Sequence, residues 1–139
     1  MIIREIEVKS ILTKTKIPGH DYCLNPYSGC AHGCRYCYAG FMQRFFGHEE
    51  RWGSYVDVKV NAVDMLRRQL KRPKTGSVCL SSVTDPYQAL EEKYRLTRGC
   101  LELLKESGLS VSILTRSPLA ARDIDLFRDF KDLEVGFSI

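Results

Sequence analysis

The sequence contains no long hydrophobic run. No apolar segment approaches the roughly 18 residues that a membrane-spanning helix needs. The first residues, from Met1 to Glu5, include charged side chains and do not form the apolar stretch of a secretory signal. We therefore expect a cytoplasmic protein that works without a membrane.

An excess of charge of one sign is also missing. The chain has 21 lysines and arginines against 17 aspartates and glutamates, a formal net charge of +4. A dedicated nucleic-acid-binding domain usually concentrates its basic residues in a stripe. The most basic stretch, residues 67–72, is interpreted as the solvated end of a helix, where cations are favourable. The charge permits contact with nucleic acid but does not argue for it.

The chain has enough apolar residues for one domain with a real core. Of its 139 residues, 44% are hydrophobic and 27% are charged, as in ordinary globular proteins. Residues 1–20 alternate apolar and charged side chains until Pro18 and Gly19 break the pattern. We interpret this segment as an N-terminal extension or edge strand, and residues 21–139 as the main domain.

Short apolar segments with the character of strands recur along the main domain. Stretches in which apolar residues have helical spacing separate them, so the order is βαβαβαβ. This alternation predicts an α/β fold with a parallel sheet, right-handed crossovers and helices outside. The expected strands lie at 22–28, 77–83, 109–114 and 133–139.

The expected helices have recognisable ends in the sequence. Polar residues that favour N-caps precede them, and proline or glycine follows them. We expect helices over 38–46, from the N-cap Asn61 to Pro73, from the N-cap Thr97 to Gly108, and from the N-cap Ser117 onward. Trp52 and Tyr55 are interpreted as loop aromatics that seal one end of the core.

The predicted sheet indicates an incomplete barrel. Its last strand reaches Ile139 with no helix to cover it. Four parallel strands also leave one edge and part of the inner face open. We therefore expect a partial TIM-like (βα)n barrel, truncated after about four strands. It is either the N-terminal part of a larger domain or completed by a second copy that associates through the open edge.

Three cysteines lie close together at the predicted carboxyl end of the first strand. Cys30, Cys34 and Cys37 have the spacing C-x3-C-x2-C within residues 29–38. Six cysteines in a chain without an export signal favour metal or redox chemistry over disulfides. Three protein ligands are one too few to complete a tetrahedral or cubane site.

The spacing alone leaves two kinds of inorganic centre open. A structural zinc site would need a fourth protein ligand, for which Cys23 or His32 is available. A [4Fe–4S] cluster held by three cysteines would instead keep one iron open for a bound molecule. The amino and carboxylate groups of a methionine moiety can together chelate an open iron.

The cysteine run resembles a known family signature. The pattern C-x3-C-x-aromatic-C is similar to that of the radical S-adenosylmethionine superfamily. Residues 25–39, 84–88 and 114–118 resemble the branch of that superfamily that contains spore photoproduct lyase. The resemblance implies a [4Fe–4S] cluster on the three cysteines and reductive cleavage of S-adenosylmethionine to a 5′-deoxyadenosyl radical. It also implies a flavodoxin- or ferredoxin-like electron donor.

The resemblance further implies which residues contact the cofactor. Tyr36 is expected near the adenine, and Thr84 and Asp85 near the methionine amino group. Arg116 takes the place of the basic residue that binds the carboxylate, and Ser138 that of the polar residue that meets the ribose or carboxylate. Without the resemblance, residues 84–86 also read as an ordinary turn and Arg116 as a surface charge.

One departure from the spore photoproduct lyase pattern affects the expected reaction. That enzyme uses a cysteine to return a hydrogen atom to the substrate radical, and Ser82 stands at the matching place here. The O–H bond of serine is too strong to be an easy donor, and Cys79 would lie on the opposite face of a regular strand. DNA photoproduct repair therefore stays an alternative to radical chemistry on an unknown substrate.

The remaining cysteines and His32 are given structural roles. Cys23, Cys79 and Cys100 are expected to be buried small hydrophobes, and His32 to fix the loop between two ligands. A non-enzymatic zinc module is the alternative from another functional class.

Overall fold

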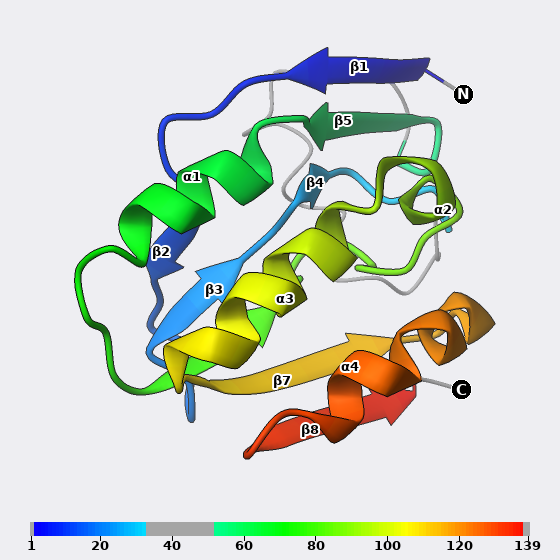
Figure 1. The fold of residues 1–139 in the computed structure, drawn as a ribbon. Coiled ribbons are helices and arrows are strands. Elements are labelled where there is room, and N and C mark those ends of the chain that lie inside the picture. Colours follow the sequence, from blue (N-terminus) through cyan, green and yellow to red (C-terminus); the bar gives the residue numbers. More distant parts are fainter. Residues whose placement is uncertain (1, 33–51, 138–139) are drawn as a thin grey trace.

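The computed structural model describes residues 2–32 and 52–137. Helices and strands alternate along most of this range, as the sequence predicts (Figure 1). The elements are β1 (Ile2–Ile6), β2 (Leu12–Lys14), β3 (Tyr22–Leu24), β4 (Tyr27–Ser28), β5 (Tyr55–Lys59), α1 (Ala62–Gln69), β6 (Ser77–Leu80), α2 (Glu91–Tyr94), α3 (Leu96–Ser107), β7 (Ser110–Thr115), the 3-10 helix η2 (Pro118–Asp123), α4 (Ile124–Arg128) and β8 (Leu133–Phe137).

The main sheet has five strands in the order β2-β3-β6-β7-β8. Strands β3, β6, β7 and β8 are parallel, and β2 pairs with β3 in the antiparallel direction at one edge. Helices α1, α3 and α4 lie over one face of this sheet (Figure 1). The expected α/β fold with a parallel sheet is confirmed for these strands.

The core lies between the sheet and the three helices. Alternate residues of each strand face the helices, because successive side chains of a strand point to opposite faces. The buried residues of this layer include Leu24, Val78, Leu80, Val111 and Ile113 from the sheet and Leu66, Leu101, Leu104 and Leu126 from the helices. The other face carries a polar row in register, Cys23, Cys79, Ser112 and Glu134.

A smaller sheet was not predicted. It has the order β1-β5-β4, with β1 parallel and β4 antiparallel to β5. The segment expected as one strand over 22–28 divides into β3 and β4, which belong to different sheets. Tyr55, expected in a loop, is the first residue of β5 and is fully buried. Trp52 contacts its ring edge-on, at 6.0 Å between centroids.

The N-terminal segment forms an edge strand in each sheet. β1 lies at the edge of the smaller sheet and β2 at the edge of the main sheet. Within the described residues the two sheets do not close into a barrel, so a partial TIM-like barrel is not confirmed. The division at residues 20 and 21 stays a prediction. None of the helices described is long and apolar enough to cross a membrane.

One of the expected helix caps is wrong, and another is confirmed only in its position. Asn61 is the N-cap residue of α1, as expected, but it forms no side-chain capping bond, because its side chain bonds both the N–H and the carbonyl of Val8. Thr97 lies inside α3, and its hydroxyl donates to the carbonyl of Pro86. Ser117 does accept from the N–H of Leu119, and Gly108 is the C-cap of α3, so both of these expectations are confirmed. The helix expected over 38–46 lies outside the described residues.

Candidate functional site

The chain after β4 and the segments that follow β6 and β7 meet at one end of the sheets. Cys30 follows β4, Thr84 and Asp85 lie in the segment after β6, and Arg116 follows β7. The hydroxyl of Thr84 donates to the carbonyl of Gly29 at 2.6 Å. Asp85 accepts from the backbone N–H of Arg116 at 3.1 Å. The fold therefore brings together the four expected site residues that the structure describes.

Gly29 allows the chain to turn toward Cys30 against the small sheet. Its φ of +84° is favourable only for glycine, and a Cβ there would lie 2.6 Å from the carbonyl oxygen of Tyr55. Cys30 follows in a backbone held close to β5 and is only 7% exposed. The first expected cysteine ligand therefore lies in a tightly placed, buried loop.

Gln88 and Thr84 hold the backbone on both sides of Cys30. Oε1 of Gln88 accepts from the N–H of Ala31 at 2.9 Å. Nε2 of Gln88 donates to the hydroxyl oxygen of Thr84 at 2.9 Å, while that hydroxyl donates to Gly29. Gln88 was not expected at the site. Its single sequence signal was its place at the end of residues 84–88, a stretch noted only for its resemblance, and its full burial is seen only in the structure.

Asp85 joins the cysteine loop to the segments that follow β6 and β7. Its Oδ1 accepts from the hydroxyl of Thr115 at 2.5 Å and from the N–H of Tyr87 at 2.9 Å. Its Oδ2 lies 3.0 Å from Nε2 of His32 and accepts from Arg116 N–H. Asp85 thus organises the site through partners within the chain, and the contact agrees with a loop-fixing role for His32.

A buried charge network supports the turn that carries Gln88. Glu91 accepts from the hydroxyl of Tyr27, from the first N–H groups of α3 and from Arg122. Asp123 accepts from the hydroxyl of Tyr87 and from Arg98. Burial raises the pKa of Tyr27, and the neighbouring Glu91 raises it further, so the phenol stays a hydrogen-bond donor.

The remaining expected site residues are described only in part. Cys34, Cys37, Tyr36 and Ser138 lie outside the described residues, so their contacts stay predictions. The side chain of Arg116 is exposed at the end of β7.

The other cysteines differ in burial. Cys100 is fully buried in the core, as expected, whereas Cys23 and Cys79 are half-buried neighbours on β3 and β6. None of the three forms a disulfide. β6 ends at Leu80, and Ser81 has a φ of +65°, so strand alternation does not relate Cys79 to Ser82.

No complete metal site is present among residues 2–32 and 52–137, where no three histidine, cysteine or acidic side chains are grouped to hold a metal ion. Sγ of Cys23 instead lies 3.2 Å from the hydroxyl of Thr13, on the strand beside it. Cys30, the one expected ligand among the described residues, has the thiol that iron–sulfur clusters require, and it lies in a loop bonded to Thr84 and Gln88.

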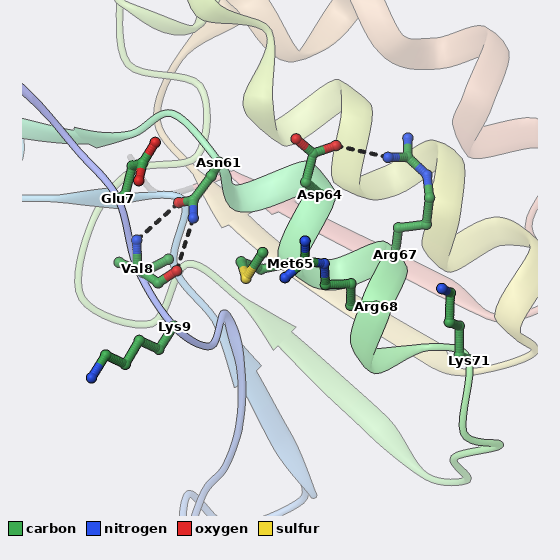
Figure 2. A pocket seen from close by; sticks show the side chains of 9 residues that line it. All are labelled: Glu7, Val8, Lys9, Asn61, Asp64, Met65, Arg67, Arg68 and Lys71. Carbon is green, nitrogen blue, oxygen red and sulfur yellow. Dashed lines mark hydrogen bonds and ion pairs between the residues drawn. The ribbon is translucent and has the colours of Figure 1, made fainter.

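A separate open hollow lies beside α1, with a volume of about 700 Å³. Figure 2 shows the ion pair between Arg67 and Asp64 and the bonds between Asn61 and Val8 at its rim. Arg67 and Arg68 are exposed in the last turn of α1, which confirms the solvated helix end expected there. The hollow is lined by Glu7, Val8, Lys9, Asn61, Asp64, Met65, Arg67, Arg68 and Lys71, none of which was expected at the cofactor site.

A family model matches most of the chain, and several known proteins are similar to it. The family model for the Radical SAM superfamily matches residues 24–139. The uncharacterised protein MJ0683 of Methanocaldococcus jannaschii is 40% identical over 137 residues, which cover 99% of this chain and 51% of that protein. The uncharacterised protein Rv2578c of Mycobacterium tuberculosis is 38% identical over 112 residues, covering 78% of this chain and 33% of that protein.

A relative with a named activity is also similar. The Radical SAM Nalpha-GlyT isomerase of Pseudomonas phage M6 is 32% identical over 105 residues, covering 74% of this chain and 21% of that protein. The chain spans about half the length of MJ0683 and smaller shares of the other two. No solved structure matches the chain at the significance that these relatives reach. The matched residues include the cysteine run and both following strand ends, and the chain therefore belongs to the radical SAM superfamily.

Proposed function

We propose that this chain is the N-terminal part of a radical enzyme core that binds a [4Fe–4S] cluster and S-adenosylmethionine. The observation that carries the proposal is the meeting of the Cys30 loop with the segments after β6 and β7. A cofactor that bridges a cluster and several strand ends needs these segments in one place. Family membership supports the same chemistry.

Cys30, Cys34 and Cys37 would hold the cluster, with the fourth iron position left to the cofactor. When bound, the cluster would supply the one electron needed for reductive cleavage of S-adenosylmethionine to methionine and a 5′-deoxyadenosyl radical. The protein's part is to orient the sulfonium and to keep solvent and stray hydrogen donors away. Tyr36, Thr84, Asp85, Arg116 and Ser138 are the proposed cofactor contacts.

The hydrogen bonds of Asp85 refine its proposed part. Its carboxyl oxygens already have partners in His32, Thr115 and Arg116. Asp85 therefore holds together the segments proposed to surround the cofactor, and any contact with the methionine amino group adds to these bonds. The side chain of Arg116 is exposed and is the proposed contact of the methionine carboxylate, which a guanidinium can bind in a bidentate manner.

The reaction on the substrate is proposed only by class. The chain resembles the spore photoproduct lyase branch, but Ser82 stands where that enzyme has its hydrogen donor. The hydroxyl of Ser82 accepts from Asn25 at 3.4 Å, in a turn and not on a strand. A relative named as an isomerase supports radical chemistry other than repair. The substrate is open to nucleic acid, peptide or small molecule, and a flavodoxin- or ferredoxin-like protein in the cytoplasm is the expected electron donor.

Anaerobic reconstitution with iron and sulfide tests the proposal. The wild-type chain should become brown and bind about four irons, which is the cluster stoichiometry. Replacing Cys30, Cys34 and Cys37 by Ala should abolish iron binding, whereas the matched Cys23→Ser and Cys79→Ser double variant should keep it. Reduction in the presence of S-adenosylmethionine should release methionine and 5′-deoxyadenosine. Colour that survives the triple replacement would contradict the cluster assignment.

The same experiment distinguishes the zinc alternative from the iron–sulfur proposal. One tightly bound zinc per chain, with no iron or sulfide after anaerobic handling, would favour a non-enzymatic zinc module. His32 would then be the fourth ligand closest in sequence to the three cysteines.

A further inference from the structure

The two peptide groups that flank Cys30 are both held by the same pair of side chains. The carbonyl of Gly29 belongs to the peptide group before Cys30, and the N–H of Ala31 belongs to the one after it. Thr84 donates to that carbonyl at 2.6 Å, and Gln88 accepts from that N–H at 2.9 Å. Both bonds join residues more than 50 positions apart in the sequence.

Holding both peptide groups determines the backbone of Cys30. Each peptide group is planar, so the orientation of two successive planes sets φ and ψ of the residue between them. The direction of the Cα–Cβ bond follows from φ and ψ. Only the χ1 rotation then remains to place the thiol, and it has three staggered positions at most.

Gln88 controls both bonds. Its Oε1 is the acceptor for Ala31, and its Nε2 donates to the hydroxyl oxygen of Thr84 at 2.9 Å. That bond occupies a lone pair of Thr84, which turns the hydroxyl proton toward Gly29. The N–H of Ala31 needs an acceptor and Thr84 needs a donor, so the network determines which way the amide of Gln88 points.

The burial of Gln88 makes this arrangement rigid. Its side chain is fully buried, and Nε2 has a further acceptor in the carbonyl of Asp85 at 3.3 Å. A buried amide that loses a partner keeps the full cost of desolvation. Alternative orientations of Gln88 are therefore unfavourable, and so are alternative backbones for Cys30.

We infer that Gln88 is a positioning residue that sets Cys30 in the geometry of a cluster ligand before any metal arrives. This inference rests on the proposed function, since it assigns Gln88 a part in cluster binding. The benefit is that the loop is ordered in advance, so the binding of iron does not have to order it. Gln88 itself touches neither metal nor cofactor in this role.

The chain contains a matched control for Gln88. Gln69 also uses one amide to hold a distant backbone, accepting from the N–H groups of Ile11 and Leu12 and donating to the carbonyl of Leu12. It holds the edge strand β2. Its hydrogen bonds within the described part of the chain go to Ser10, Ile11 and Leu12, not to the Cys30 loop. Gln69→Met and Gln88→Met remove the same chemical groups, so a general loss of stability affects both.

The first test needs no metal. Amide hydrogen exchange of the full apo chain should show Ala31 protected in the wild type and in Gln69→Met. In Gln88→Met the N–H of Ala31 loses its acceptor, and its exchange should be about tenfold faster or more, as expected for the loss of one buried hydrogen bond. Equal exchange of Ala31 in the two variants overturns the inference.

The second test uses the reconstituted chain and an iron chelator. Iron should leave Gln88→Met about tenfold faster than Gln69→Met, because one ligand is no longer held in advance. If Gln88→Met does not fold, Gln88→Glu replaces it. Glutamate keeps the acceptor for Ala31 but takes the hydroxyl proton of Thr84 away from Gly29, so Ala31 should stay protected while iron release is faster. Iron release at the wild-type rate from Gln88→Glu overturns the inference.

Failure of the proposed function has a different signature. If the wild-type chain takes up no iron, the cluster assignment falls, whatever the variants do. The exchange of Ala31 then still decides whether Gln88 holds the backbone of Cys30.

Discussion

Nε2 of His32 lies 3.0 Å from Oδ2 of Asp85, which links the cysteine loop to the turn after β6. The same carboxyl group accepts from Thr115 and from the N–H of Arg116, at the end of β7. One buried side chain therefore connects three segments of the candidate site. Its removal should affect all of them together.

Replacing Asp85 by Ala should lower the free energy of unfolding by about 2 to 4 kcal/mol, because buried donors lose their acceptor. Urea denaturation checks this. The matched control is Asp64→Ala, since Asp64 is 70% exposed and pairs with Arg67, whereas Asp85 is 8% exposed. That control should cost about 0.5 kcal/mol or less. Equal losses in the two variants would show that Asp85 does not connect the segments as described.

Gly29 and Gly19 share a φ of +84° but differ in their surroundings. Gly19→Ala places a Cβ in open space, so it should cost only the strain of the left-handed backbone, about 1 kcal/mol. Gly29→Ala adds a contact of 2.6 Å with the carbonyl oxygen of Tyr55 and should cost about 3 kcal/mol or more. Thermal or urea unfolding of both variants measures the difference. A Gly29→Ala variant no less stable than Gly19→Ala would contradict the close approach of the two segments.

The buried carboxyl of Asp123 should make stability depend on acid pH. Burial raises the pKa of Asp123, but hydrogen bonds from Arg122, Arg98 and Tyr87 outweigh this effect and lower the pKa below its usual value. A carboxyl with a lowered pKa stabilises the fold above its unfolded-state pKa of about 3.9. That stabilisation is lost as the pH falls through the folded-state pKa.

Asp123→Asn should therefore be less stable than the wild type by about 3 kcal/mol at pH 7, because it breaks a buried ion pair. The difference should shrink as the pH falls below about 4, and denaturant unfolding at several pH values follows it. Asp125→Asn is the control variant. Arg98 lowers the pKa of Asp125 to about 2, but water screens this exposed ion pair. A constant difference between wild type and Asp123→Asn across the acid range would contradict the prediction.

Cysteine alkylation tests the burial of Cys79 and Cys100. Burial raises the pKa of Cys100, and Glu91 raises it further. Burial also raises the pKa of Cys79, with a smaller contribution from Cys23. At pH 8 both thiols should be alkylated at least about tenfold more slowly than in the unfolded chain, because only the thiolate reacts. Mass spectrometry of the peptides gives the rates, and rapid labelling of Cys100 in the folded chain would contradict its core position.

Elements defined by short-range patterns were predicted best. The strands that begin near Ser77, Ser110 and Leu133 follow from apolar runs, and the caps at Ser117 and Gly108 follow from residues next to them. In these cases the local chain supplies the favourable conformation. Tertiary contacts then reinforce a preference that already exists.

The hydrogen bonds of two expected caps show where local patterns fail. Asn61 and Thr97 are residue types that favour N-caps, yet the first N–H groups of α3 bind Glu91, and Asn61 binds Val8. A side chain can form a hydrogen bond with a distant backbone group as well as with a nearby one, and the local sequence does not distinguish these two outcomes. β5 was missed for a related reason, because it pairs with β1, a strand far away in the sequence, from Ile2 with Tyr55 to Ile6 with Lys59.

The sequence by itself determined the spacing of Cys30, Cys34 and Cys37, the order of the main parallel strands with helices between them and, with these, the family. These are properties of residue type and periodicity, which do not depend on distant contacts. Only the tertiary structure decided that Thr84 and Gln88 hold the peptide groups on either side of Cys30. Those bonds join residues 55 and 57 positions apart, and they form only when the fold brings the loop after β4 to the segment after β6, a strand that runs parallel to β3.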